Sequence, residues 1–336
     1  MTTSQDEFPW SVNQLNTGTK DVGLILTVSL LILLPSTGIF EPEDLTVEPC
    51  NGSPENCDKA YTDVTFPETH NAHASLDENF TFLSANHRQN LSQQWDAGFR
   101  AFMLDIHHSR YSDSLENTSF CHGSYDLGIH PCVTGSQNAI DLLSILHQKM
   151  NTSERDVVTL LFEVYVPYSH IAYILNMTGL MDKTHIQTLG EPWPTLETMV
   201  RSQHNLVVFI EGGFDSDYPY LHNFVQHGWT TNYAERNVED MTCDVHRGDS
   251  TQPVWHMNNW LALDNGLTDY TRAPIVNAYD FLLNRSLDCW EAHGSRPTFV
   301  AVDWWTDGEA VNVTRTLNQM NHWSDEVPLR ATTDSR

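Results

Sequence analysis

Short apolar runs alternate along the chain with longer segments in which apolar residues recur every three or four positions. Four of these runs are nearly continuous in apolar residues, as strands buried on both faces are. They cover residues 101–105, 157–163, 206–211 and 299–303. Helices are expected over 137–150, over 194–201 with Pro194 in the first turn, and from a cap at Thr306 and Asp307 to about residue 320. This alternation predicts an α/β fold with a parallel sheet and crossover helices.

An uncharged apolar run at residues 22–34 precedes a Pro-Ser-Thr-Gly segment near the N-terminus. Such a run is short for crossing a bilayer but fits the central region of a signal peptide, and an uncleaved anchor extending to Phe40 remains the alternative. Residues 1–40 are therefore expected to be a leader, residues 41–59 a disulfide-stapled lead-in, and residues 323–336 a polar tail. With either leader we expect a secreted, lumenal or extracellular protein, free or tethered by its N-terminal segment.

The chain carries 44 acidic and 17 basic residues, which give a formal net charge of -27 at pH 7. This charge excludes nucleic acid as a partner and a broad electrostatic attraction to an anionic membrane. The acidity is not that of a disordered segment, because 40% of the residues are hydrophobic and no block of like charge stands out. The composition therefore describes a folded domain with an acidic surface.

Six cysteines and eight N-x-Ser/Thr sites also indicate the secretory pathway. Six cysteines allow fifteen pairings, and six reduced thiols are a further alternative. The spacing favours the sequential pairing, which is Cys50 with Cys57, Cys121 with Cys132, and Cys243 with Cys289. The candidate glycosylation sites are Asn51, Asn79, Asn90, Asn117, Asn151, Asn176, Asn284 and Asn312. Composition explains part of this number, and the remainder favours a glycoprotein.

Each of the four apolar runs ends on a carboxylate, and these are Asp105, Glu163, Glu211 and Asp303. The carboxyl ends of parallel barrel strands open on one mouth, so four acids would converge there. The alternative is that acids follow strands because loops are polar. Residues 212–248, rich in Tyr, His, Trp and Asp, are expected to form a long loop that selects a substrate at this mouth or packs on the rim.

Two histidines, His70 and His122, follow short apolar runs and stand beside small residues. A histidine just past a strand end can present its ring to a substrate and transfer protons near neutral pH. Two that face each other could remove a proton on one side of a phosphorus atom and return one on the other. A single histidine in such a place is more often structural, which is how we interpret His107, His108 and His130.

Several segments, taken in order, resemble the phospholipase C-like phosphodiesterases. They are Thr69-His70-Asn71, residues 94–105 with Gly98-Phe99-Arg100, Cys121-His122-Gly123 and residues 158–163, followed by Cys243 with Arg247, Met257-Asn258 and residues 300–303. The resemblance covers roughly residues 60–320 and is greatest to eukaryotic proteins with a phosphatidylinositol-specific phospholipase C X domain. It implies a TIM-type (β/α)8 barrel, regular or distorted, in a single domain over residues 60–322.

The resemblance also implies catalytic roles. His70 matches the general base of the family, His122 matches the general acid, and Asp303 matches the acid that orients the first histidine. Arg100 is expected to make structural contacts within the barrel and not to contact phosphate.

A divalent cation, Ca²⁺ before others, is the expected cofactor. Asn71, Asp105 and Glu163 match three calcium ligands of the metal-dependent members. Met103 stands where those members have a further ligand, a Glu, and His107 stands where the metal-independent members have an Arg. Water and a phosphate oxygen can fill open positions around a hard cation, so binding is expected to be weaker and not lost.

The function that these residues predict is a phosphoric diester hydrolase that cleaves the headgroup ester of a phospholipid or glycolipid. A membrane surface is a candidate place of action, and no protein partner is implied. The second hypothesis is a barrel that binds lipid or glycan without turnover, because Met103 and His107 leave the charge-stabilising residues incomplete. The third is a two-carboxylate glycosidase using Glu163 and Glu211, which leaves the two histidines unexplained.

Overall fold

The computed structural model describes residues 48–123, 125 and 128–329. The expected leader at 1–40, residues 41–47 of the expected lead-in and residues 330–336 of the expected tail lie outside these described residues. Within the described part of the chain, no helix has both the length and the apolar character that a membrane crossing requires. The described residues form a single domain.

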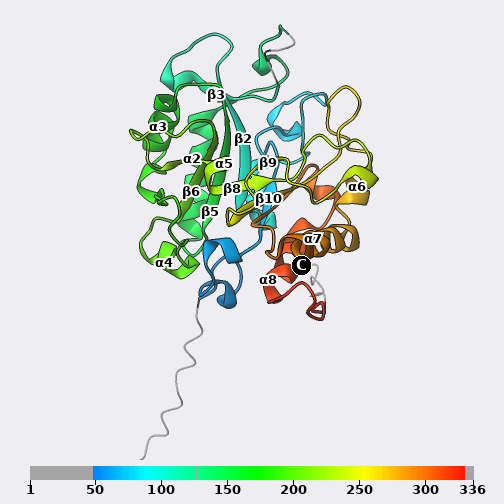
Figure 1. Cartoon of the computed structure of the whole chain (residues 1–336). Helices are drawn as coiled ribbons and strands as arrows, with labels where there is room; N and C mark the ends of the chain where they lie inside the picture. Colours follow the sequence, from blue (N-terminus) through cyan, green and yellow to red (C-terminus); the bar gives the residue numbers. More distant parts are fainter. Residues whose placement is uncertain (1–47, 124, 126–127, 330–336) are drawn as a thin grey trace, which may run out of the picture. The chain divides into compact units, whose positions relative to one another are not determined.

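A parallel sheet forms the centre of the domain (Figure 1). Its strands are β1 (Phe66–Thr69), β2 (Ala101–His108), β3 (Thr118–Phe120), β4 (Gln137–Asn138), β5 (Val158–Val164), β6 (Leu206–Glu211), β7 (Leu221–Asn223), β8 (Gly228–Thr230), β9 (Arg247–Gly248), β10 (Val254–Asn259) and β11 (Phe299–Val302). Neighbouring strands along the order β7-β6-β5-β2-β1-β11-β10-β8 are parallel. Strand β9 pairs antiparallel with β8, and β3 and β4 extend β2 antiparallel.

The sheet curls as an open barrel. Parallel strands follow one another around it in chain order, as in a (β/α)8 barrel. No pairing among the described residues joins β7 to β8, so the barrel stays open between these two short strands. The α/β barrel expected from the sequence is therefore confirmed, in a distorted form.

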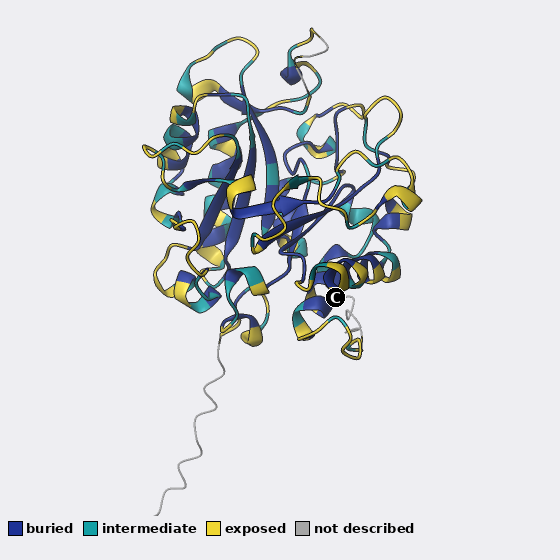
Figure 2. Cartoon of the chain, viewed as in Figure 1, coloured by how far each residue is buried: buried dark blue, intermediate teal, exposed yellow. Residues whose placement is uncertain are grey.

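Helices cover the outside of the sheet. They are α1 (Leu91–Ala97), α2 (Ala139–Thr152), α3 (Tyr168–Met177), α4 (Leu196–Arg201), α5 (Phe224–His227), α6 (Ala273–Val276), α7 (Tyr279–His293) and α8 (Ala310–Gln319). Figure 1 shows α2, α3 and α4 on the side of β5 and β6, with α7 and α8 on the opposite side. The strands are buried, whereas the outer faces of the helices are exposed (Figure 2).

Three helix starts differ from the sequence expectation. The segment expected from residue 137 begins at Ala139, because the Asn138 side chain caps it and residues 137–138 form β4. Helix α4 begins at Leu196, since Thr195 accepts the capping hydrogen bond from Thr198, so Pro194 is not in its first turn. Helix α8 begins at Ala310, after a separate 3-10 turn over Trp305–Asp307, and the expected cap at Thr306 and Asp307 is wrong.

The expectation of one long loop over residues 212–248 is also wrong. Strands β7 and β8 lie inside this segment with α5 between them, and β9 ends it. Each of these strands has at most three residues and includes polar ones, so an apolar run could not reveal them.

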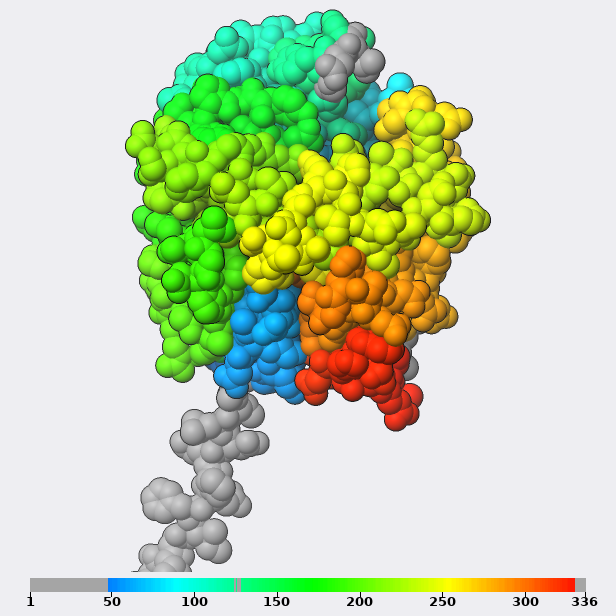
Figure 3. Space-filling view, viewed as in Figure 1, coloured from blue at the N-terminus to red at the C-terminus, as the bar shows by residue number. Residues whose placement is uncertain are grey.

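Three disulfides join Cys50 to Cys57, Cys121 to Cys132, and Cys243 to Cys289, which is the sequential pairing. The first closes the lead-in. Figure 3 shows this segment, in blue, between the green segment that includes α4 and the C-terminal helices in orange and red. Backbone hydrogen bonds from Leu196 to the oxygen of Lys59 and from Glu197 to that of Cys57 attach the lead-in to α4.

Candidate active site

The two-residue alternation of the strands separates an inner from an outer face of the barrel. Outward residues such as Phe102, Phe162 and Val208 join the core cluster that contains α2, α3 and α7. Inward residues join a second cluster, which includes Phe66, Ala101, Leu161, Phe209 and Phe299. Each of these five residues is followed, two or four positions later and on the same face, by a polar residue. In the same order, these polar residues are His70, Asp105, Glu163, Glu211 and Asp303. The strands thus direct these five side chains toward the inside, at the carboxyl end of the barrel.

His70, just after β1, is held on three sides. Its Nδ1 lies 2.9 Å from Oδ1 of Asp303 and therefore donates a hydrogen bond to this carboxylate. Its ring stacks on Trp260 with centroids 3.9 Å apart and planes 6° apart. The Nδ2 of Asn71 lies 3.1 Å from Nε2 and donates to it. The side chain keeps 20% of its surface exposed, so Nε2 is the nitrogen that a substrate can reach.

Asp303 is buried and fully engaged by hydrogen bonds. Asn86 donates from Nδ2 to Oδ1 at 2.9 Å, next to the bond from His70, and the hydroxyl of Thr268 donates to Oδ2. Burial by itself would raise the pKa of Asp303, but the charge and the hydrogen bond of His70, together with the other donors, hold this pKa below its usual range. Asp303 is therefore an ionised partner that fixes the Nδ1–H tautomer of His70.

His122 lies after β3, beside the Cys121–Cys132 disulfide. Its Nδ1 donates to the backbone oxygen of Ser84 at 2.7 Å, which leaves Nε2 for a substrate. Burial lowers the pKa of His122, the bond to Ser84 opposes this shift, and the nearby charge of His70 adds to it. The two histidines therefore lie close enough for the charge of one to act on the other.

Asp105, Glu163 and Glu211 form an acidic group on three adjacent strands. Asp105 is the register partner of Glu163, and Glu163 is that of Glu211. Burial raises the pKa of Asp105 well above its usual range, and the charges of Glu163 and Glu211 raise it further. Burial also raises the pKa of Glu163, against a hydrogen bond from Tyr165. Both oxygens of Glu211 accept hydrogen bonds from Arg247, at 2.9 and 2.6 Å.

The three expected metal ligands fit a hard cation by their chemistry. Asp105 is 6% exposed, and burial and the charges of Glu163 and Glu211, without a hydrogen bond, are what raise the pKa of its carboxyl group. Asn71 is buried at a left-handed φ of 50°, and because its Nδ2 faces His70, its Oδ1 is available as a ligand. Asp105 and Asn71 thus offer side-chain oxygens, and Glu163 offers the oxygen that Tyr165 does not bind. Carboxylate and amide oxygens are the donors that Ca²⁺ prefers.

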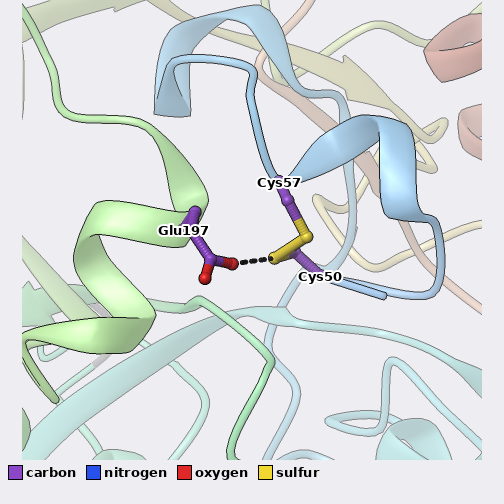
Figure 4. A group of neighbouring side chains, drawn as sticks. All are labelled: Cys50, Cys57 and Glu197. Atoms are coloured by element: carbon purple, nitrogen blue, oxygen red, sulfur yellow. Dashed lines mark hydrogen bonds between the residues drawn. A yellow bond between two sulfur atoms is a disulfide. The ribbon is translucent and has the colours of Figure 1, made fainter. Parts of the chain in front are cut away.

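A different group has the tightest arrangement of potential ligands among the described His, Cys, Asp and Glu residues. Cys50, Cys57 and Glu197 bring their ligand atoms within 4.8 Å of one another (Figure 4). Both sulfurs are in a disulfide, and Arg155 donates to Glu197 and lies 3.3 Å from Cys50 Sγ. No thiolate is available, so this group is a structural staple and not a metal site.

Met103 and His107 stand on the same face of β2 as Asp105. Met103 packs on the inner apolar cluster below the acids. His107 is fully buried, stacks on Tyr165 with centroids 4.2 Å apart, and has no hydrogen-bond partner on either ring nitrogen among the described residues. Burial lowers the pKa of His107 to about 4, so the ring carries no charge at neutral pH. Neither residue supplies the charge that the matching family position supplies.

Sequence reasoning missed several residues that shape the site. Ser84, Asn86, Thr268 and Trp260 lie in loops, where no periodic pattern marks a side chain. Arg247 was noted only as part of the family resemblance. Arg100 is structural, as expected, because it pairs with Asp156 at 2.8 Å and donates to the backbone oxygens of Trp95 and Phe99.

The glycosylation sites differ in how accessible they are. Asn79, Asn117, Asn151, Asn176 and Asn284 are exposed, and Asn51, Asn90 and Asn312 are half-buried. The amide of Asn51 is bound on both polar atoms by backbone, because its Nδ2 donates to the oxygen of Val157 at 2.8 Å and its Oδ1 accepts from the nitrogen of Val157 at 2.9 Å. The amide of Asn312 is bound on both atoms by side chains, those of Glu309 and Arg315. Modification at any of the eight stays a prediction.

Comparisons with known proteins agree with the sequence motifs. A family model described as PI-PLC X 1 matches residues 56–318. The chain is 24% identical over 315 residues to the PI-PLC X domain-containing protein 1 of Arthroderma benhamiae, covering 88% of this chain and 96% of that one. It is 23% identical over 314 residues to an uncharacterized secreted protein of the same organism, covering 84% of this chain and 66% of that one.

The fold is also that of solved enzymes. The phosphatidylinositol-specific phospholipase C from Listeria monocytogenes superposes with a TM-score of 0.53 at 12% sequence identity, covering 78% of this chain and 94% of that one. At this identity the likeness concerns the fold alone. Because the family match spans most of the chain, the protein belongs to the PI-PLC X domain family.

Proposed function

We propose that the protein is a phosphoric diester hydrolase that cleaves the headgroup ester of a phospholipid by histidine general base and acid catalysis. The observation that carries this proposal is the matched anchoring of two neighbouring histidines. His70 and His122 each donate from Nδ1 to a fixed oxygen, so each presents Nε2. Family membership supports the same class of reaction.

In the proposed reaction a hydroxyl group of the substrate attacks its own phosphorus atom. The Nε2 of His70 takes the hydroxyl proton, displacing the amide of Asn71 from this nitrogen, and Asp303 stabilises the imidazolium that results. The Nε2 of His122 donates a proton to the leaving oxygen, so that the phosphorus–oxygen bond breaks and an alcohol departs. The phosphodiester anion beside His122 favours the protonated ring and offsets the effect of burial on its pKa.

The negative charges of Asp105, Glu163 and Glu211 favour the binding of a cation at the site. Asn71, Asp105 and Glu163 would hold a divalent cation, Ca²⁺ before others. When bound, the cation would neutralise charge that develops on the equatorial phosphate oxygens.

The substrate proposed is a phospholipid or glycolipid with a hydroxyl-bearing headgroup, reached at a membrane surface. The structural neighbours are named phosphatidylinositol-specific phospholipases C, which supports this choice. Three disulfides and a relative named a secreted protein support an extracellular place of action.

The test is release of a phosphorylated headgroup from phosphatidylinositol vesicles by the wild type, His70→Ala and His122→Ala. We expect both substitutions to abolish release, because each removes one proton transfer. His204→Ala, an exposed histidine remote from the site, is the matched control and should keep wild-type turnover. Turnover that survives in both catalytic variants would refute the proposal.

A second function, lipid or glycan binding without turnover, is favoured by one observation. Met103 and His107 provide no charge where the family has it, and the Asn71 amide occupies His70 Nε2. This function predicts vesicle binding by the wild type, unchanged in His122→Ala, with no headgroup release. The glycosidase hypothesis finds no such support, since Arg247 occupies both oxygens of Glu211.

A further inference from the structure

We propose that the loop segment from Ser84 to His87 positions the catalytic groups, and that Asn86 is a positioning residue for Asp303 and His70. The inference rests on the proposed function, because it assigns His70, Asp303 and His122 to one reaction. It adds residues that make no contact with the substrate. These residues act through the side chains that do.

The segment contacts each of the three catalytic residues. The oxygen of Ser84 accepts the hydrogen bond from Nδ1 of His122 at 2.7 Å. Asn86 donates to Oδ1 of Asp303 at 2.9 Å. His87 donates from Nε2 to the backbone oxygen of His70 at 2.7 Å. Four consecutive positions therefore connect the proposed general acid, the proposed general base and the carboxylate that orients the base.

The segment is itself fixed to the barrel. The backbone nitrogens of Asn86 and His87 both donate to the oxygen of Ala74, at 2.8 and 3.1 Å. The oxygen of Asn86 accepts from the nitrogen of Trp304, the residue after Asp303, at 2.8 Å. Asn86 and His87 are 1% and 0% exposed. A short loop held this firmly can set the separation of two histidines that come from different strands.

The side chain of Asn86 is committed to Asp303. Its Nδ2 makes the bond to Oδ1, while its Oδ1 is buried and has no hydrogen-bond partner among the described residues. A buried amide oxygen without a partner destabilises a fold, so packing alone does not account for an asparagine here. Its donor, together with the Thr268 hydroxyl, restricts rotation of the carboxylate that accepts the hydrogen bond from His70.

The experiment compares Asn86→Ala with Asn205→Ala. Asn205 is also buried, and it donates to the backbone oxygen of Asp156 at 2.7 Å just before β6, at the amino end of the barrel. Both changes remove one buried side-chain hydrogen bond, so both should lower Tm. We expect kcat on phosphatidylinositol vesicles to fall roughly tenfold to a hundredfold in Asn86→Ala, with KM within about twofold, and to stay unchanged in Asn205→Ala.

A second variant separates the lost donor from the lost volume. Asn86→Leu keeps a side chain of similar size without a donor, so it should show the same kcat loss even if Asn86→Ala does not fold. Equal kcat values in Asn86→Leu and the wild type would overturn the proposal. So would a kcat loss in Asn205→Ala as large as that in the Asn86 variants.

A spectroscopic measurement distinguishes failure of this inference from failure of the proposed function. The Nδ1 proton of His70, held against Asp303, is followed by proton NMR and assigned by its absence in His70→Gln. We expect it to shift or broaden in Asn86→Leu and to be unchanged in Asn205→Ala. If the wild type turns over no phosphodiester, the proposed function fails, and this signal still tests the positioning role. An unchanged signal in Asn86→Leu would overturn it.

Discussion

The Nδ1 of His122 donates its hydrogen bond to a backbone carbonyl, that of Ser84, whereas the Nδ1 of His70 donates to the carboxylate of Asp303. A carboxylate stabilises an imidazolium more than a carbonyl does, because it carries a full charge. The two rings therefore differ in the way that a base and an acid should differ. This difference supports the proposed roles of His70 as the general base and His122 as the general acid.

The leaving group should decide how much His122 matters. A diacylglycerol oxygen needs a proton as it departs, whereas a p-nitrophenolate leaves without one. We expect His122→Ala to lose roughly a hundredfold to ten-thousandfold in kcat on phosphatidylinositol and far less on a p-nitrophenyl phosphodiester of the same headgroup. His70→Ala should lose activity on both substrates. Equal losses on both substrates in His122→Ala would contradict the role of general acid.

Replacing Asp303 tests the orientation of the base. In Asp303→Asn the amide can donate to Nδ1 of His70, which moves the ring proton to Nε2 and blocks this nitrogen as a base. We expect kcat at pH 7 to fall by roughly three to four orders of magnitude. Asp307→Asn removes a surface ion pair with Arg88 and should leave kcat nearly unchanged. A loss in Asp303→Asn no greater than that in Asp307→Asn would argue against this role.

Stability should depend on pH through Asp105. The folded-state pKa of Asp105 is raised by burial and by Glu163 and Glu211, so the unfolded chain releases this proton first as pH rises. The free energy of unfolding therefore falls as pH rises from the unfolded pKa, about 4, through the folded one. Asp105→Asn removes the ionisable group and with it this loss of stability. Its Tm in EDTA should exceed that of the wild type at pH 7, with a smaller difference at pH 4.

The matching measurement is thermal unfolding at both pH values. Each 1 kcal/mol regained should raise Tm by roughly 2–4 °C. An Asp105→Asn protein that is less stable than the wild type at pH 7 in EDTA would show that the carboxylate has a stabilising partner.

Met103 should limit calcium affinity. It precedes Asp105 by two positions on the same face of β2, where a carboxylate would extend the set of Asn71, Asp105 and Glu163. We expect Met103→Glu to bind Ca²⁺ roughly tenfold more tightly than Met103→Gln, a difference of about 1.4 kcal/mol, measured by isothermal titration. Without Ca²⁺ it should have the lower Tm, because it adds another acid to the group. Equal affinities in the two variants would place the cation elsewhere.

The sequence revealed the parts of the site that follow strand periodicity. Asp105, Glu163 and Glu211 continue the inward face of long apolar strands, so both their existence and their common direction could be predicted. His70 carried a local motif as well. The family resemblance added the pairing of roles, which periodicity alone does not give.

The remaining parts depend on tertiary contacts that no local pattern encodes. Asn86 reaches Asp303 across 217 positions, and Arg247 reaches Glu211 across 36. Strands β7 and β8 are too short and too polar to be distinguished from a loop. Helix starts were misplaced by two or three residues, since neighbouring residues compete for the N-cap position and differ by small energies.

Asn51 is both a candidate glycosylation site and a structural contact of the fold. Its amide is bound on both polar atoms by the backbone of Val157, the residue just before β5. A sugar attached to Nδ2 would take the edge of the amide that makes these bonds. Carbohydrate transfer and closure of this contact therefore compete for one nitrogen atom. The fraction of Asn51 that carries a glycan, measured by mass spectrometry, would therefore report how fast glycosylation is relative to folding of this contact.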